Sequence, residues 1–321
     1  MSKKVKIVIA GIGGVGGYFG GLLAKKHENS DTIEICFLAR GMHLEKIRTN
    51  GLKVIHGKTE FMARPSIATS NAREFGTADY ILICTKGYDL NATIEQLKPC
   101  IDKDTIVIPL LNGVESVEQI KNILPDIAVS EGCVYIVSKL KEAGIIENTG
   151  INQKLFFGPG TLNNDRLLWL EKIMLEAGIE ASLSDSILTI VWEKFIFIAS
   201  IATATSYFNC SIGKLIEENE ETLVQLIEEV KLIAVAKGIS FNPDITNYIV
   251  NYNQLLPYDS TSSMHRDYQN LKSNTEFETL TGYIVRAGHE LNIETPAFTK
   301  AYNYLINKKE NHLDTERTKI N

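Results

Sequence analysis

The stretch that decides the fold is VKIVIAGIGGVGGYFG, residues 5–20. Its first six residues form an apolar strand pattern, and Gly11-x-Gly13-x-x-Gly16 then opens a helical pattern that continues to about residue 26. In such a turn Gly11 makes the tight bend, Gly13 lets the backbone approach a pyrophosphate, and Gly16 allows close packing of the helix on the sheet. The helix N-terminus supplies donors to the anion. We therefore predict a dinucleotide-binding loop that consists of Gly11, Ile12, Gly13, Gly14, Val15 and Gly16.

The rest of the first half repeats the alternation of apolar runs and helical patterns. Further apolar runs cover residues 33–38, 80–84, 105–110 and 127–137, and a helical pattern covers 43–49. Strands that are apolar on both faces and separated by helices indicate a parallel sheet covered on both sides. Residues 139–158 alternate polar and apolar side chains, which predicts a hairpin or edge strands that close this sheet. The fold class is α/β, with an N-terminal Rossmann-type dinucleotide-binding domain.

The second half lacks strand patterns from about Ser184 onward. Ser184 and Asp185 can cap a long helix that begins at Ile187. Further helical patterns cover residues 220–237, 244–255, 277–291 and 298–306. We expect an all-helical C-terminal domain, with the dinucleotide-binding domain over 1–183 and the helical substrate domain over 184–321.

The end of the second predicted strand bears on the choice of cofactor. An NAD-preferring site presents Asp or Glu there for the ribose 2′-hydroxyl, whereas this chain has Ala39-Arg40-Gly41. The guanidinium of Arg40 can bind a 2′-phosphate through charge-assisted hydrogen bonds, so NADP(H) is favoured over NAD. The alternative is that Arg40 is only a solvated loop charge.

Composition excludes several other classes of protein. The 321-residue chain carries a net charge of -6 with scattered Lys and Arg, so nucleic acid is not an expected partner. The longest apolar runs, such as 81–84 and 195–201, are shorter than the ~20 residues of a membrane span, and the apolar start ends in the glycine turn rather than a cleavage site. We expect a cytoplasmic protein. The five cysteines and six histidines show no metal-ligand spacing, so no metal is expected.

Lys194 is the most informative residue of the second half. It interrupts an apolar helical pattern and is followed directly by Phe195-Ile196-Phe197-Ile198. A lysine in such surroundings loses hydration, which lowers its pKa toward the range that suits proton transfer. A ketone that accepts a hydride needs such a proton donor. The alternative is a lysine whose ammonium extends to solvent from the helix edge.

Several short motifs together resemble the ketopantoate reductases over the whole chain. They are the glycine turn of residues 11–17, LARG of 38–41, CTK of 84–86, LNG of 111–113, WEK of 192–194, SSM of 262–264 and TE of 275–276. The resemblance implies NADPH-dependent reduction of ketopantoate (2-dehydropantoate) to pantoate, in pantothenate and coenzyme A biosynthesis. It makes Lys194 the general acid and Glu276 the acidic partner that contacts substrate and cofactor and holds the lysine. It assigns Lys86 and Asn112 to the cofactor and substrate cleft, and Ser263 to the substrate carboxylate.

The chain departs from the family pattern at two places. One residue more than usual separates Ser263 from Glu276, so Glu278 is an alternative acidic partner. Ile198 and Ala202 occupy the substrate-facing positions, one and two helical turns past Lys194, where the family has asparagines. A substrate hydroxyl facing them would lose hydrogen bonds unless a neighbour such as Thr203, Thr205 or Asn209 substitutes.

Two other functions remain open from the sequence. One is reduction of a related branched 2-keto acid, or the reaction of a 3-hydroxyacid dehydrogenase-like enzyme. The other is a non-catalytic NADP-sensing protein, against which the presence of both Lys194 and Glu276 argues. In each case the expected partner is a small molecule, and the helical domain is a possible homodimer surface.

Overall fold

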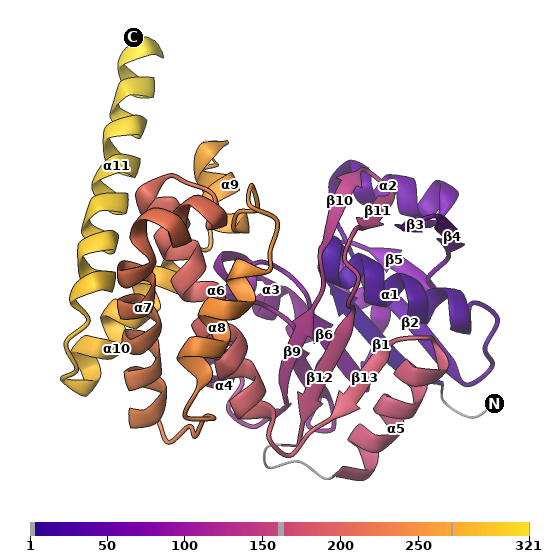
Figure 1. Cartoon of the computed structure of the whole chain (residues 1–321). Helices are drawn as coiled ribbons and strands as arrows, with labels where there is room; N and C mark the ends of the chain where they lie inside the picture. Colours follow the sequence, from indigo (N-terminus) through magenta and orange to yellow (C-terminus); the bar gives the residue numbers. More distant parts are fainter. Residues whose placement is uncertain (1–3, 160–163, 271, 321) are drawn as a thin grey trace. The chain divides into compact units, whose positions relative to one another are not determined.

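A computed structural model describes residues 4–159, 164–270 and 272–320 of the chain (Figure 1). It divides into two compact units, Met1–Ile190 and Val191–Asn321. The division falls inside helix α6 (Ile187–Phe208), a few residues beyond the predicted boundary at 183/184. The α/β class with a helical second half is confirmed.

The central sheet of the first unit has six parallel strands in the order β5-β2-β1-β6-β7-β8. Their bounds are Val5–Ala10 (β1), Ile33–Leu38 (β2), Ile67–Thr69 (β5), Tyr80–Ile83 (β6), Ile106–Pro109 (β7) and Ala128–Val129 (β8). Alternate residues of β1 enter two separate apolar cores. Ile7 and Ile9 pack with α1 (Gly14–His27) and α5 (Asn164–Glu176), whereas Val8 packs in the core of α3 (Leu90–Leu97) and α4 (Ser116–Ile123). This double burial explains the uninterrupted apolar runs.

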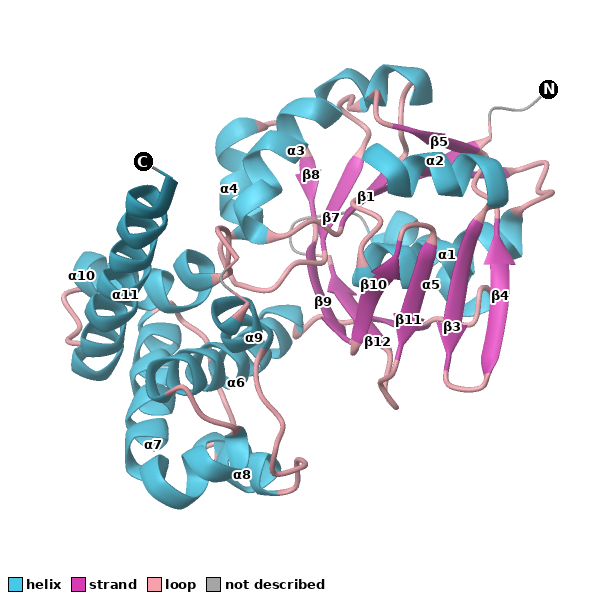
Figure 2. Cartoon of the chain, turned by 90° about the horizontal axis from the view of Figure 1, so that it is seen from above, coloured by secondary structure: helices cyan, strands magenta, loops and turns pink. Residues whose placement is uncertain are grey.

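A second sheet, with the order β10-β11-β3-β4, was only partly predicted (Figure 2). Its strands are Leu52–His56 (β3), Thr59–Ala63 (β4), Ser138–Glu142 (β10) and Ile145–Asn148 (β11). The predicted hairpin after residue 139 exists, but the prediction that it closes the parallel sheet is wrong, because β11 pairs in parallel with β3. A half-buried alternating pattern indicates a strand without specifying its neighbour.

A third sheet, β13-β12-β9, completes the first unit. Its strands are Glu131–Tyr135 (β9), Lys154–Gly158 (β12) and Glu180–Leu183 (β13). The apolar run at 127–137, expected as one strand, is therefore divided between β8 in the central sheet and β9 in this one.

Helix α1 lies against both the parallel sheet and the second sheet, and its glycines make this possible. A Cβ on Gly16 would collide with the carbonyl oxygen of Gly11, below the helix. A Cβ on Gly14 would collide with the carbonyl oxygen of Ser138 in β10, and one on Gly17 would lie 2.5 Å from Cγ1 of Ile146 in β11. The glycine-rich stretch thus serves close packing on two sides as well as the loop itself.

The second unit is helical throughout the residues described. After α6 come Ile212–Ala236 (α7), Ile245–Gln254 (α8), Ser263–Gln269 (α9), the π-helical turn Glu278–Gly282 (η4), Tyr283–Leu291 (α10) and Pro296–Ile320 (α11). Helix α7 is kinked at Asn219, with φ -143° and ψ 26°, which explains why its periodic pattern is read only from residue 220.

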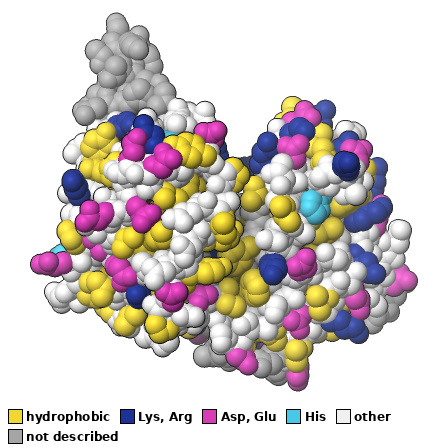
Figure 3. All heavy atoms as spheres, in the orientation of Figure 1, with side chains coloured by type: hydrophobic (Ala, Val, Ile, Leu, Met, Phe, Trp, Pro, Cys, Tyr) yellow, Lys and Arg dark blue, Asp and Glu magenta, His cyan; other side chains and the backbone are white. Residues whose placement is uncertain are grey.

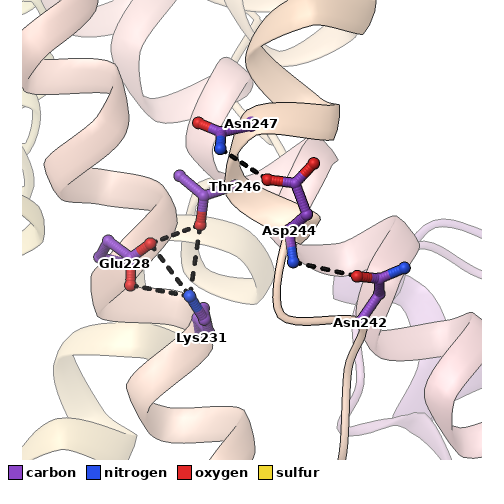
Figure 4. A network of polar contacts seen from close by, with 6 residues as sticks. All are labelled: Glu228, Lys231, Asn242, Asp244, Thr246 and Asn247. Atoms are coloured by element: carbon purple, nitrogen blue, oxygen red, sulfur yellow. Dashed lines mark hydrogen bonds and ion pairs between the residues drawn. The ribbon is translucent and has the colours of Figure 1, made fainter.

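Figure 4 shows the polar contacts between α7 and α8, where Glu228 binds Lys231 and accepts a hydrogen bond from Thr246.

Helix α6 corrects the expectation that no segment is long enough to cross a membrane. Among the residues described, it is the one helix whose length and apolar composition would suffice for a membrane span. The only charged residues that interrupt its apolar sequence are Glu193 and Lys194. In the structure 61% of its apolar window is buried inside the protein, with Phe195, Ile196 and Ala199 in the core of the second unit. A buried core helix passes the same test.

On the face drawn in Figure 3, Lys and Arg side chains are mixed with Asp and Glu side chains.

Candidate active site

The glycine loop connects the carboxyl end of β1 to α1 and leaves room for a ligand at one position. Gly11 has φ 92°, a left-handed conformation that suits glycine, and its N–H donates to the carbonyl of Leu38 at 3.2 Å. Gly13 is the N-cap of α1. A Cβ built on Gly13 meets no atom within 4 Å, unlike those on the glycines that pack against protein. The absence of a side chain there leaves space beside the helix N-terminus, which fits an anionic group such as a pyrophosphate.

Thr85 supplies a second observation that fits a nucleotide at this loop. It follows β6, and its Cγ2 would lie 2.8 Å from a Cβ on Gly11, so the side chain borders the loop. Its hydroxyl is buried and has no hydrogen-bond partner within the described parts of the chain. Because buried hydroxyls are normally paired, Thr85 fits a ligand that brings its own polar groups. Apart from its place in the CTK motif, nothing in the sequence distinguishes this threonine.

Arg40 lies where the prediction requires it, at the carboxyl end of β2 and as the N-cap of α2 (Gly41–Asn50). Strand β2 is a direct neighbour of β1, so Arg40 and the glycine loop share one edge of the sheet. Its side chain is 87% exposed, and its guanidinium lies 3.4 Å from a carboxylate oxygen of Asp89. An exposed ion pair of this kind contributes only about 0–1 kcal/mol, so it presents a small barrier to a phosphate. Asp89 was not anticipated from the sequence.

Lys86 and Asn112 follow the next two strands of the same sheet edge. Lys86 comes after β6 and precedes the short 3₁₀ turn Gly87–Asp89, and Asn112 comes after β7. Because β1, β6 and β7 are parallel neighbours, both residues extend the edge that begins at the glycine loop. Both side chains are half-buried. This edge is where open α/β sheets bind ligands.

In the second unit, Lys194 lies half-buried on α6. Trp192 and Phe195, close to it along this helix, are buried, and both of their rings contact Tyr283 of α10, with centroids 6.1 and 5.6 Å away. The apolar helix inferred from the sequence around Lys194 therefore packs into the interior of the second unit.

Glu276 is 2% exposed, just before the π-helical turn. A buried carboxylate must be matched by donors or by a positive charge, and π-helical turns often occur at functional sites. Glu278 is different, because it is exposed and binds Arg286 at 2.9 Å and the hydroxyl of Tyr302 at 3.1 Å. Of the two glutamates that the sequence left open, Glu276 is the one in the interior.

Ser263 is the first residue of α9 and is half-buried. A serine at the start of a helix can also serve as its cap. In the structure the cap is Ser262, whose hydroxyl accepts from the backbone N–H of His265 at 3.0 Å. The hydroxyl of Ser263 is therefore not used as the helix cap.

The three residues that could replace the missing asparagines are already paired within the second unit. The hydroxyls of Thr203 and Thr281 lie 2.7 Å apart, and those of Thr205 and Ser262 lie 2.9 Å apart. Asn209 accepts a hydrogen bond from the His265 ring at 3.0 Å. Beyond Lys194 on α6, Ile198 is half-buried and Ala202 is buried, so these two positions offer apolar contact.

A Rossmann-type domain followed by a helical domain with a half-buried lysine and a buried glutamate defines a class of oxidoreductases. Family models described as "Ketopantoate reductase PanE/ApbA" and "Ketopantoate reductase PanE/ApbA C terminal" match residues 7–161 and 186–309. The chain belongs to the ketopantoate reductase family.

Individual relatives cover nearly the whole chain. An uncharacterized oxidoreductase, YkpB of Bacillus subtilis, is 29% identical over 93% of this chain and 97% of its own. A 2-dehydropantoate 2-reductase of Streptococcus pyogenes is 24% identical over 95% of this chain and 97% of its own. The crystal structure of 2-dehydropantoate 2-reductase from Porphyromonas gingivalis is 34% identical, with a TM-score of 0.84 over 95% of this chain and 100% of that one.

Proposed function

We propose that this protein is an NADP-dependent 2-dehydropantoate 2-reductase, which reduces ketopantoate to pantoate in the cytoplasm as a step of pantothenate and coenzyme A biosynthesis. The observation that carries the proposal is that one helical unit holds both a half-buried lysine, Lys194, and a deeply buried glutamate, Glu276. A lysine and a carboxylate kept from water suit acid catalysis at a ketone.

Each candidate site residue has a separate role in the proposed reduction. When bound, NADPH supplies a hydride. The ammonium of Lys194 stabilises the negative charge that develops on the substrate oxygen and then donates its proton there. Glu276 orients that ammonium, and the hydroxyl of Ser263 donates to the substrate carboxylate. Lys86 and Asn112 bind cofactor and substrate at the edge of the parallel sheet.

NADPH is the proposed reductant because of Arg40. Its exposed guanidinium lies at the end of β2, where an acidic residue would repel a 2′-phosphate. The backbone N–H groups at the N-terminus of α1 bind the pyrophosphate, which both nicotinamide cofactors share.

Ketopantoate is the first candidate substrate, and a branched 2-keto acid without its terminal hydroxyl is the second. The second candidate rests on Ile198 and Ala202, together with the internal pairing of Thr203, Thr205 and Asn209. A terminal hydroxyl that faces these two side chains would lose its water without gaining a protein partner.

The test is a steady-state assay of NADPH oxidation with ketopantoate, 2-ketoisovalerate and a 3-keto acid, with Lys194→Ala as the inactive control. Turnover of a 2-keto acid supports the proposal, and turnover of the 3-keto acid alone would favour a 3-hydroxyacid dehydrogenase-like enzyme. NADPH binding without turnover of any of the three would favour a sensing protein. Sedimentation of the same preparation tests whether the helical domain forms a homodimer surface, as the sequence allows.

A further inference from the structure

We propose that His43 is a positioning residue, which fixes the orientation of the Ile12–Gly13 peptide so that the glycine loop is preset for a pyrophosphate. The inference rests on the proposed dinucleotide function of the loop. It assigns a role to a side chain in the first turn of α2, outside the motifs that identify the site.

Both ring nitrogens of His43 are held by backbone groups from two distant segments. Nε2 lies 2.7 Å from the carbonyl oxygen of Ile12, and Nδ1 accepts a hydrogen bond from the N–H of Gly144 at 2.8 Å. A backbone N–H can only donate and a carbonyl can only accept. The ring is therefore neutral, with its proton on Nε2. Burial lowers the pKa of His43 despite the opposing effect of the Ile12 carbonyl, which agrees with a neutral ring.

The bond to Ile12 determines where the next N–H points. In a trans peptide the carbonyl and the following N–H point in opposite directions, and every peptide bond in the described structure is trans. Holding the Ile12 oxygen toward His43 therefore aims the Gly13 N–H away from the histidine. Among the glycines of this loop, Gly13 is the one where an added Cβ meets nothing within 4 Å. A donor that is oriented before the anion arrives avoids the cost of ordering it during binding.

His43 and Arg40 belong to the same turn of α2 but have different tasks. Arg40 keeps an exposed guanidinium for a 2′-phosphate, whereas both nitrogens of His43 are already used. Its second bond, to Gly144, ties α2 to the turn between β10 and β11 in the second sheet. The histidine thus links the loop, the Arg40 helix and the second sheet, and it acts on the part of the cofactor that NADPH and NADH share.

The experiment measures dissociation constants of NADPH and NADH by calorimetry for the wild type, His43→Gln, His43→Asn and His43→Ala. The amide nitrogen of glutamine takes the place of Nε2 and can still donate to Ile12, whereas the amide oxygen of asparagine takes the place of Nδ1 and can accept only from Gly144. We expect His43→Ala to weaken both cofactors about tenfold, equal to about 1.4 kcal/mol. His43→Gln should recover most of this loss, and His43→Asn little of it. His56→Gln, which alters a ring bound to Tyr18 in the same unit, is the control and should leave both constants unchanged.

Three results would overturn the inference. The first is an unchanged affinity of His43→Ala for both cofactors, and the second is a loss of affinity for NADPH alone. The third is that His43→Gln and His43→Asn bind the cofactors equally well. If His43→Ala does not fold, the comparison of the glutamine and asparagine variants still decides. Wild-type protein that binds NADPH but reduces no keto acid would contradict the proposed reaction and leave this inference standing. Wild-type protein that binds neither nucleotide would overturn both.

Discussion

The hydroxyl groups of Thr203 and Thr281 lie 2.7 Å apart in the interior of the helical unit, both with no exposed surface, and they join α6 to the π-helical turn. Helix α6 carries Lys194, and the turn begins directly after Glu276 and Phe277. We expect Thr203→Val to cost about 1–3 kcal/mol of stability, because it leaves the hydroxyl of Thr281 buried without a partner.

The double variant Thr203→Val, Thr281→Val should cost less than the sum of the two single variants, since no orphaned hydroxyl remains. Denaturant midpoints of the four proteins measure this coupling. Strictly additive losses would show that the two hydroxyls do not depend on each other. The single variants should also lower kcat more than they change KM, because the displaced groups act on the transition state.

Arg40→Ala should raise the KM for NADPH much more than that for NADH, because only NADPH has the 2′-phosphate. Asp89→Ala is the matched control, since it removes the other half of the ion pair and keeps the guanidinium. The preference for NADPH should persist or increase in that variant, because an acidic neighbour of the phosphate is gone. Initial rates at varied cofactor concentration provide the measurement. A wild-type protein that uses the two cofactors equally well would remove the basis of the prediction.

Lys194→Ala should lower kcat by roughly 10²–10⁴-fold, the usual contribution of a general acid. The dissociation constant of NADPH should change little, since the glycine loop and Arg40 lie in the other unit. Glu278→Gln is a useful comparison because that glutamate is exposed and bound to Arg286. It should keep near-normal turnover, whereas Glu276→Gln should not. Retention of most turnover in Lys194→Ala would rule out its role as the acid.

The apolar pair Ile198 and Ala202 predicts little or no preference for ketopantoate over 2-ketoisovalerate, which lacks the terminal hydroxyl and so loses no hydrogen bond there. Ile198→Asn restores an amide and should raise the ratio of the two kcat/KM values about tenfold or more, in line with ~1–3 kcal/mol for a polar group left unpaired. Ile198→Leu, which stays apolar, should leave the ratio unchanged. A wild-type ratio of 10⁴ or above would mean that other groups already bind the hydroxyl.

The parts of the protein that the sequence predicted well are those decided by neighbours along the chain. The strand of residues 5–10, the glycine turn and α1 follow from local pattern, and so does the long helix from Ile187. The second sheet was recognised only in part, because the pairing of β11 with β3 joins segments that are far apart in sequence. Strand alternation carries no information about such a partner.

In the site, too, local sequence identifies some residues, and only the packing of distant segments identifies the others. Lys194 is visible as a charge within an apolar run, but Glu276 and Glu278 are two residues apart and have the same chemistry. Only packing separates them, because one is buried and the other is held at the surface by Arg286 and Tyr302. Thr85 and His43 could not be singled out, since their significance lies in what their side chains meet across the fold.

Because α1 packs against two sheets, most of its glycines are required by the fold and are not specific evidence for nucleotide binding. Gly14, Gly16 and Gly17 are demanded by neighbouring backbone and side chains, so the architecture would keep them even in a descendant that had lost its nucleotide. Gly13 is different, because no protein atom occupies the place of its side chain. A larger residue at Gly13 would therefore be compatible with the architecture while filling the space beside the helix N-terminus, so its appearance in a descendant would indicate loss of the dinucleotide rather than loss of the fold.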